Sequence, residues 1–302
     1  MSKTSAWIKA IRLRTLPLAV SSISMGGFLA AFYGAFRLDV FLLCICTTIL
    51  LQMLSNLAND YGDFKNGADL TGRIGPVRAV QSGVISPESM KNAMVLFTLL
   101  AFISGVYLLY ISKGLESLNV FGLFLGMGIV AIIASIKYTA GNNPYGYAGL
   151  GDISVLIFFG WIGVIGSFYL QTGYIKPSLL LPATSCGLFA TGVLNINNIR
   201  DIASDTEAGK RTIPMRIGRK YAIYYHIFLL TIGISCAIFY TIITYKSVEQ
   251  FLFLVSVPFF ISNIVKVVKL DSKYLNPYLK QMALTTLLFV VSFGIGLLLS
   301  NR

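Results

Sequence analysis

The feature that most constrains the fold is a series of long apolar runs spread over the whole chain. A run of roughly 20 apolar residues is long enough to cross the hydrocarbon core of a bilayer as a helix. Such runs occupy residues 16–36, 39–59, 91–112, 118–137, 153–171, 178–198, 221–244, 250–268 and 279–300. Hydrophobic residues make up 56% of the 302-residue chain and charged residues only 12%, which excludes a soluble domain. The sequence therefore predicts an all-α, polytopic membrane protein with nine transmembrane helices.

Lysine and arginine are unevenly distributed between the loops that join these runs. If the N-terminus is cytoplasmic, only five of the 24 basic residues fall on the other side: Arg37, Lys113, Lys176, Lys246 and Arg302. Cytoplasmic loops carry an excess of basic residues. We therefore expect a protein of the cell membrane with a cytoplasmic N-terminus and an external C-terminus. The net charge of +12 then reflects topology and contact with anionic membrane lipids, and the scatter of these residues argues against nucleic acid as a partner.

Acidic residues are concentrated at two places. The chain has 12 of them, and six lie within or directly beside residues 56–69 and 195–205: Asp60, Asp63, Asp69, Asp201, Asp205 and Glu207. Each stretch follows an apolar run, the second and the sixth. Carboxylates are costly next to a bilayer, so this clustering indicates a bound cation or a cationic partner.

The spacing of the polar residues predicts that each cluster lies on one face of a helix. At about 100° per residue, one side of a helix holds Asn56, Asn59, Asp60 and Asp63, and a second narrow face holds Asn198, Asp201 and Asp205. Mg²⁺ usually binds through one or two carboxylates together with substrate phosphates. The pattern predicts a Mg²⁺ site with Asp60, Asp63, Asp69, Asp201 and Asp205 as ligands. The only histidine, His226, leaves no room for histidine-based metal or triad chemistry.

Basic residues follow both acidic stretches. Arg73 and Arg78 lie in the loop after the first, Arg200 lies within the second, and Lys137 ends the fourth apolar run. One interpretation is simple charge balance on the cytoplasmic side. The other is a diphosphate site, because guanidinium groups bind phosphate oxygens bidentately, and Lys137 would stabilise the charge that develops as the diphosphate leaves.

A glycine- and tyrosine-rich loop at residues 138–152 joins the fourth and fifth runs. Its backbone needs hydrogen-bond partners at the edge of the membrane, so we expect it to line a cavity. Taken by themselves, the rings of Tyr138, Tyr145 and Tyr147 are typical of anchors at the membrane interface.

The chain is expected to form a single domain over residues 1–302. Segments of about 39–90 and 178–220 share one plan, an apolar run ending in Asn and Asp followed by a basic loop. This predicts a weak internal duplication around one central pocket.

These motifs resemble those of a known family, the UbiA-type intramembrane aromatic prenyltransferases. The matching stretches are Asn56–Asp63 with Asp69, Arg73–Arg78 with Gln81, Pro144–Asp152 and Asn195–Asp201 with Asp205. The likeness is greatest to the branch that prenylates 1,4-dihydroxy-2-naphthoate in menaquinone biosynthesis.

The resemblance implies nine helices around a central cavity that is closed by the two motif-bearing loops. It also implies that Mg²⁺ bridges the aspartates to a polyprenyl diphosphate. Departure of diphosphate would leave an allylic cation, which the naphthoate ring attacks with loss of CO₂ to form demethylmenaquinone. Substrate contacts are then expected from Asn56, Asn59, Arg73, Arg78, Tyr138, Tyr145, Tyr147, Asn198 and Arg200, and catalytic roles from Asp60, Asp63, Asp201, Asp205 and Lys137.

Two alternatives stay open. A related prenyltransferase would use 4-hydroxybenzoate or homogentisate as acceptor, because the aspartate motifs do not define the aromatic ring. A secondary transporter would also carry intramembrane polar residues and internal symmetry. Transporter carboxylates usually lie near the middle of the membrane, however, whereas these lie at the ends of the apolar runs.

Overall fold

The structure is a computed structural model that describes residues 2–67, 78–112 and 117–302. Over these ranges it is helical, with nine segments long and apolar enough to cross a membrane, as the sequence predicts. The segments are Lys3–Phe32, Leu38–Lys65, Pro87–Ile111, Leu118–Lys137, Gly151–Thr172, Pro177–Arg200, Ile213–Ile243, Val248–Lys269 and Asn276–Leu299.

Several segments contain more than one helical element. The elements in chain order are α1 (Lys3–Ile11), η1 (Leu13–Thr15), α2 (Leu16–Phe32), α3 (Leu38–Lys65), α4 (Pro87–Ile111), α5 (Leu118–Lys137), α6 (Gly151–Val155), η3 (Leu156–Gly166), α7 (Ser167–Thr172), η4 (Pro177–Leu179), α8 (Leu180–Arg200), α9 (Ile202–Glu207), α10 (Ile213–Ile243), η5 (Val248–Ser256), α11 (Val257–Lys269), η6 (Ser272–Tyr274) and α12 (Asn276–Leu299).

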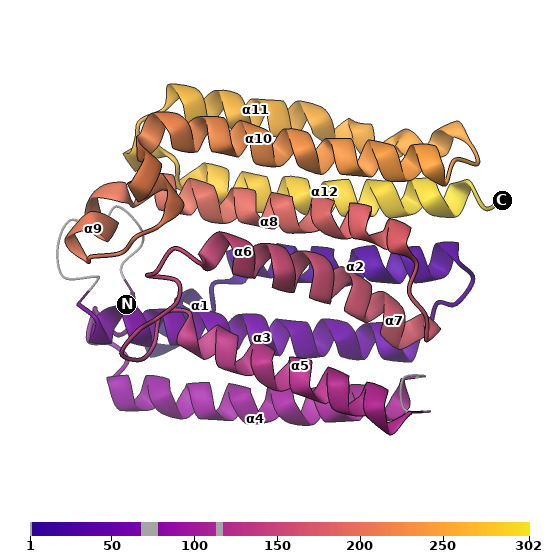
Figure 1. Ribbon diagram of the computed structural model, residues 1–302. Helices are drawn as coiled ribbons and strands as arrows, with labels where there is room; N and C mark the ends of the chain where they lie inside the picture. Colours follow the sequence, from indigo (N-terminus) through magenta and orange to yellow (C-terminus); the bar gives the residue numbers. More distant parts are fainter. Residues whose placement is uncertain (1, 68–77, 113–116) are drawn as a thin grey trace.

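The long helices lie side by side with nearly parallel axes (Figure 1). α8 is the central element, packed against η3, α10 and α12, and 16 of its 21 residues are buried. α5 has no buried residue, which is the pattern of a helix that faces lipid. The N-terminus, α9 and the ends of α3 and α8 lie at one end of the bundle, and the C-terminus lies at the other (Figure 1). The structure thus places both acidic stretches at the same end as the N-terminus.

Helix α3 runs further than its apolar composition suggests. The expected span ends at residue 59. The helix in fact continues to Lys65, because Gly62 lets it lie directly against the backbone of Thr139, where a Cβ would stand 2.5 Å from the carbonyl carbon. The whole run from Asn56 to Asp63 is therefore helical.

Close packing of η3 and α8 sets the wall of the central cavity. A Cβ at Gly160 would lie 2.7 Å from the carbonyl oxygen of Ala183, and Gly187 faces it at a similar separation. Small residues at such crossings let two membrane helices approach closely. The element η3 (Leu156–Gly166) has π-helical hydrogen bonding, a geometry that is frequent at functional sites.

Candidate active site

A large cavity of about 440 Å³ lies among the described helices, between α2, α3, α4, α5, η3 and α8. One end is polar and is lined by residues of both acidic stretches, and the rest is lined mainly by apolar side chains such as Leu109, Phe124, Phe158 and Leu170. On α3 both Cys44 and Asp63 line it. At 1.5 Å per residue those positions are about 28 Å apart, close to the thickness of a hydrocarbon core.

Asp63 faces this cavity from the first stretch. Its side chain is 2% exposed and forms an ion pair with Arg78, and it accepts a hydrogen bond from the hydroxyl of Tyr147. The ammonium of Lys210 lies 3.5 Å from Oδ1 of Asp63. Three donors from three different loops therefore converge on one carboxylate.

Asp201 and Asp205 face the same polar end from the second stretch. α8 ends at Arg200, and Asp201 separates it from the short helix α9, which carries Asp205. The two carboxylates thus lie on two elements, rather than on the single helical face that the spacing predicted. Nζ of Lys210 lies 3.0 Å from Oδ1 of Asp205, so this ammonium joins Asp205 to Asp63. Burial raises the pKa of Asp205, and the charge of Lys210 opposes that shift.

Arg200 does not line the cavity; it lies behind Asp201. Its side chain is 1% exposed, and its Nε donates to Oδ1 of Asp201 at 2.8 Å while Nη2 reaches the second oxygen. Further bonds join Nη2 to Asn197 and Nη1 to Asn276, both at 3.0 Å. In the structure Arg200 therefore orients Asp201, and its expected contact with diphosphate stays a prediction.

The asparagines of the first stretch have separate tasks. Asn56 donates from Nδ2 to the carbonyl of Ile11 at 2.7 Å and to Oγ1 of Thr15 at 3.0 Å, which ties α3 to the end of α1 and to η1. Asn59 accepts from the Thr139 hydroxyl at 2.9 Å, and its backbone carbonyl accepts from Arg78. Both asparagines line the cavity, as does Asn198.

Asp60 points away from the cavity. Its two carboxylate oxygens accept hydrogen bonds from the backbone N–H groups of Ala79 and Val80, at 3.1 and 3.2 Å. The side chain is 2% exposed, so these bonds hold the segment that carries Arg78 against α3. In the structure Asp60 anchors this segment, and its expected role as a metal ligand stays a prediction.

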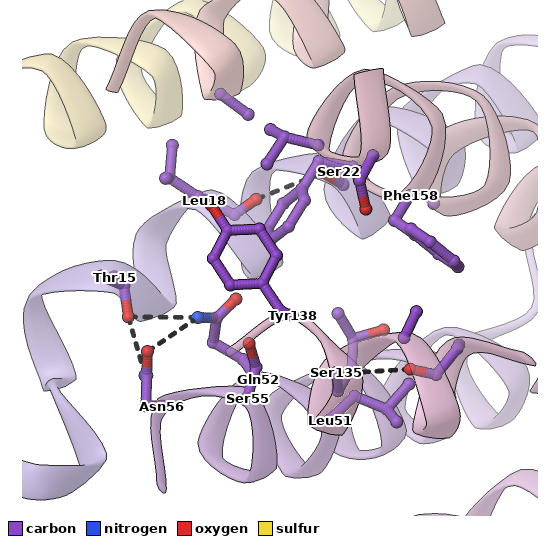
Figure 2. Close-up of a pocket in the computed structure, with 18 of the residues that line it drawn as sticks. Thr15, Leu18, Ser22, Leu51, Gln52, Ser55, Asn56, Ser135, Tyr138 and Phe158 are labelled. Carbon is purple, nitrogen blue, oxygen red and sulfur yellow. Dashed lines mark hydrogen bonds between the residues drawn. The ribbon is translucent and has the colours of Figure 1, made fainter. Parts of the chain in front are cut away.

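The tyrosine-rich loop does line the cavity, as expected. Tyr138 projects into the space between α2, α3 and η3 (Figure 2), and Tyr145 packs edge-on against it at 5.3 Å between ring centroids. The Tyr145 hydroxyl lies 3.0 Å from the carbonyl of Ala134 and 3.1 Å from the Ser154 hydroxyl. Burial raises the pKa of both Tyr138 and Tyr145, so their hydroxyls stay protonated at neutral pH. Tyr138 is the ring best placed to face a substrate.

Three other predicted residues do not join this group in the described structure. Lys137 has an exposed side chain and is absent from the cavity wall, so a catalytic role for it stays a prediction. Asp69 and Arg73 lie outside the described residues.

The polar end also contains residues that sequence reasoning left out. Lys210 joins the two acidic stretches, and Arg12, Arg14, Thr15, Gln52 and Lys280 line the cavity. Arg12 and Arg14 form a basic pair before the first apolar run. Their position directly before Thr15-Leu16-Pro17 was the one available signal, because nothing in the sequence relates them to aspartates 50 to 190 residues away.

The donor set fits a divalent cation that is shared with a phosphate-bearing substrate. Within the described ranges no three acidic, cysteine or histidine side chains form a ready-made metal cluster. Asp63 and Asp205 are instead joined by the ammonium of Lys210, so a positive charge already lies between the two stretches. A two-carboxylate site of this kind suits Mg²⁺, which commonly completes its coordination with water and substrate phosphates.

Comparison with known proteins gives a consistent family assignment. The model of the UbiA prenyltransferase family matches residues 19–287. A relative in Escherichia coli (strain K12), 1,4-dihydroxy-2-naphthoate octaprenyltransferase, is 45% identical over 100% of this chain and 97% of its own. The protein of the same name in Haemophilus influenzae is 43% identical over 98% and 97% of the two chains.

Solved structures show the same fold. The apo structure of a UbiA homolog from Aeropyrum pernix K1 matches with a TM-score of 0.71 and 16% identity, over 96% of this chain and 99% of that one. A UbiA homolog from Archaeoglobus fulgidus bound to GPP and Mg²⁺ matches with a TM-score of 0.67 and 14% identity, over 97% and 99%. The chain belongs to the UbiA prenyltransferase family.

Proposed function

We propose that this protein transfers a polyprenyl group from polyprenyl diphosphate to 1,4-dihydroxy-2-naphthoate, with Mg²⁺ as cofactor. The observation that carries the proposal is the cavity itself, which has aspartates of both stretches at its polar end and continues along the apolar length of the bundle. The diphosphate of such a substrate suits the polar end of the cavity, and its long isoprenoid tail suits the apolar length. The names of the relatives that are 45% and 43% identical supply the acceptor.

The residues at the polar end bind and orient the diphosphate. We assign the contacts with its oxygens to Arg78 and Lys210, and the binding of the cation to Asp63, Asp201 and Asp205, because all five line the cavity. Bound Mg²⁺ stabilises negative charge on the leaving diphosphate. The C–O bond breaks with its electron pair going to diphosphate, and the ring of Tyr138 faces the resulting allylic cation, an interaction worth about 0.5–2 kcal/mol.

The aromatic acceptor completes the reaction. Its ring carbon forms the new C–C bond to the allylic carbon, and the bond to the carboxylate then breaks so that CO₂ leaves and its electron pair returns to the ring. The products are diphosphate, CO₂ and demethylmenaquinone in its hydroquinone state. No base is needed at that carbon, since CO₂ leaves in place of a proton.

The membrane location belongs to the same proposal. The apolar part of the cavity is lined by helices long and apolar enough to cross a bilayer, so we place the isoprenoid tail at membrane depth. Only five of the 24 basic residues lie on the side of the C-terminus. Because cytoplasmic loops carry an excess of basic residues, we place the polar end in the cytoplasm and the protein in the cell membrane.

The direct test uses purified protein with labelled polyprenyl diphosphate and one acceptor at a time. We expect Mg²⁺-dependent prenylation of 1,4-dihydroxy-2-naphthoate with release of CO₂, and little product from 4-hydroxybenzoate or homogentisate. Efficient prenylation of either single-ring acceptor, with none of the naphthoate, would replace this proposal by the related enzyme. Absence of transfer to all three acceptors would refute the prenyltransferase assignment of this chain.

A further inference from the structure

A polar strip on α3 extends the polar end of the cavity toward its apolar part. Thr48, Gln52 and Ser55 line the cavity and follow one another at spacings of four and three residues, so they share one face of the helix. From the helical rise, Ser55 and Gln52 lie about 12 and 16 Å from Asp63 along the axis. Polar side chains at membrane depth are costly and mark substrate pathways in membrane proteins.

The amide of Gln52 has a defined orientation. Its Nε2 donates to Oγ1 of Thr15 and to Oδ1 of Asn56, both at 3.3 Å. These two bonds hold the nitrogen on one side, and the carbonyl oxygen points the other way, toward the space beside Tyr138 (Figure 2). Among the described residues none donates a hydrogen bond to that oxygen. Gln52 therefore presents a hydrogen-bond acceptor to the cavity.

Ser55 presents a hydroxyl to the same cavity. Serines elsewhere in the spans, such as Ser21, Ser22 and Ser135, donate to the carbonyl four residues earlier. That bond satisfies the hydroxyl within its own helix. Within the described ranges the structure records no such bond for Ser55, whose side chain is half-buried in the cavity wall. Its hydroxyl can therefore donate to, or accept from, a bound molecule.

One of the two proposed substrates has groups that match these side chains. An isoprenoid tail has no hydrogen-bonding group, and a polar side chain that faced only the tail would lose its hydration without compensation. The diphosphate is assigned to the level of Asp63. The acceptor has an aromatic ring and two hydroxyl groups, and Tyr138 and Phe158 supply aromatic rings to the same cavity (Figure 2). The chemistry of Gln52 and Ser55 therefore fits the acceptor.

We propose that Gln52, together with Ser55, binds the 4-hydroxyl group of the aromatic acceptor. This inference rests on the proposed function and deepens it by assigning the specificity for a dihydroxylated ring. The 1-hydroxyl group lies beside the acceptor carboxylate and can bond to it internally, which leaves the 4-hydroxyl for the protein. That hydroxyl donates to the carbonyl oxygen of Gln52 and accepts from the hydroxyl of Ser55. An acceptor without it leaves both polar groups unpaired, which is how a site rejects such an analogue.

The first experiment compares an acceptor that has the 4-hydroxyl with an inhibitor that lacks it. The quantities measured are the KM for 1,4-dihydroxy-2-naphthoate and the inhibition constant of 1-hydroxy-2-naphthoate against it. Gln52→Met has nearly the same size and no amide, so it should raise that KM about threefold to tenfold. The inhibition constant should stay at the wild-type value, because the inhibitor has no 4-hydroxyl. The kcat should also stay unchanged, since the 4-hydroxyl takes no part in the new bond.

A change in the shape of the cavity would act differently. Gln52 also bonds to Thr15 and Asn56, and a disturbance of those contacts would weaken acceptor and inhibitor equally. Ser55→Ala leaves those bonds in place and should raise the same KM about twofold, again without a change in the inhibition constant. Ser24→Ala is its matched control and should match wild type, because Ser24 is a half-buried serine of α2 that does not line the cavity.

Two results would overturn the inference. One is a parallel rise in the acceptor KM and in the inhibition constant for Gln52→Met, and the other is no change in either. If Gln52→Met does not fold, the ratio of the two constants in Ser55→Ala decides the same question.

These outcomes are distinguishable from failure of the proposed function. A wild-type protein that does not prenylate the naphthoate at all refutes the proposed function. A wild-type protein that does so, with the same ratio of acceptor KM to inhibition constant in both variants, refutes only the assignment of Gln52 and Ser55.

Discussion

The hydroxyl of Tyr147 donates a hydrogen bond to Oδ1 of Asp63, which lies 84 positions earlier in the chain. The ring of Tyr147 also lies under the ammonium of Lys210, 4.9 Å from its centroid. One side chain of the tyrosine-rich loop therefore contacts Asp63 of the first acidic stretch and Lys210, which follows the second. Its position makes Tyr147 a support for the charged end of the cavity, and not a free ring at the membrane interface.

Tyr147→Phe should weaken catalysis while leaving the fold intact. The substitution keeps the ring beneath Lys210 and removes only the hydrogen bond to the carboxylate, an interaction of about 1.5–3 kcal/mol for a charged group. We expect kcat/KM to fall about tenfold or more, with a higher Mg²⁺ concentration needed for half-maximal rate. Tyr110→Phe, at a residue 71% exposed on α4, is the control and should match wild type. Equal rates for all three proteins would show that this hydrogen bond has no role in catalysis.

The aspartates of the first stretch should divide into two kinds. Asp63→Asn, like Asp205→Asn, removes a carboxylate from the cavity, so activity should fall by orders of magnitude at limiting Mg²⁺ while the protein stays folded. Removal of metal with EDTA should likewise abolish turnover, and added Mg²⁺ should restore it. Turnover near the wild-type level in Asp63→Asn would contradict the assigned role.

Asp60→Asn should act mainly on stability. One of its two oxygens becomes an NH₂ group that faces a backbone N–H, so a buried donor at Ala79 or Val80 loses its partner. A lost partner of this kind costs about 1–3 kcal/mol. The melting temperature in detergent should therefore fall further for Asp60→Asn than for Asp63→Asn. The reverse order would show that Asp60 does not anchor this segment.

Arg200→Lys tests how Asp201 is held. Lysine keeps the charge but not the planar fork that bonds to Asp201, Asn197 and Asn276 together. Breaking a buried pair costs about 3–5 kcal/mol, and an exposed pair contributes about 0–1 kcal/mol. Arg37→Lys is a matched control, because Arg37 forms the same fork on Asp39 at an exposed position. Thermal unfolding should therefore separate the two variants clearly, and equal melting temperatures would contradict this account.

The apolar length of the cavity can be tested on one helix. Gly128 lines the cavity on α5 and has nothing within 4 Å of an added Cβ, whereas Gly126 has the same open surroundings but does not line it. Gly128→Phe should lower the rate with long polyprenyl diphosphates more than with geranyl diphosphate, because the ring fills space that the tail needs. Gly126→Phe should affect both substrates equally and slightly. An identical chain-length profile in the two variants would place the tail elsewhere.

The orientation in the membrane can be tested by labelling on a cysteine-free background. Thr206→Cys lies at an exposed position of α9, and Lys176→Cys lies at the opposite end of the bundle. In intact cells an impermeant maleimide should label Lys176→Cys and not Thr206→Cys. The opposite pattern would reverse the proposed topology.

The sequence by itself determined the membrane class, the nine apolar spans and the presence of two acidic stretches. These are properties of short windows, since hydrophobicity over about 20 residues and the charge of a loop need no knowledge of distant contacts. The same local motifs were sufficient to indicate the family. The expected helix ends were less accurate: α3 continues six residues beyond the apolar run and α10 begins at Ile213, because packing and not hydropathy decides where a helix stops.

Only the tertiary structure decided the task of each polar side chain. Asp60 and Asp63 are one helical turn apart and look equivalent in sequence, yet one bonds to the backbone of Ala79 and Val80 and the other faces the cavity. Arg200 lies behind Asp201, and Arg12 is brought to the site from the N-terminal segment. These outcomes depend on which helix face meets which neighbour. That is a matter of contacts between residues far apart in the chain, and no local pattern encodes it.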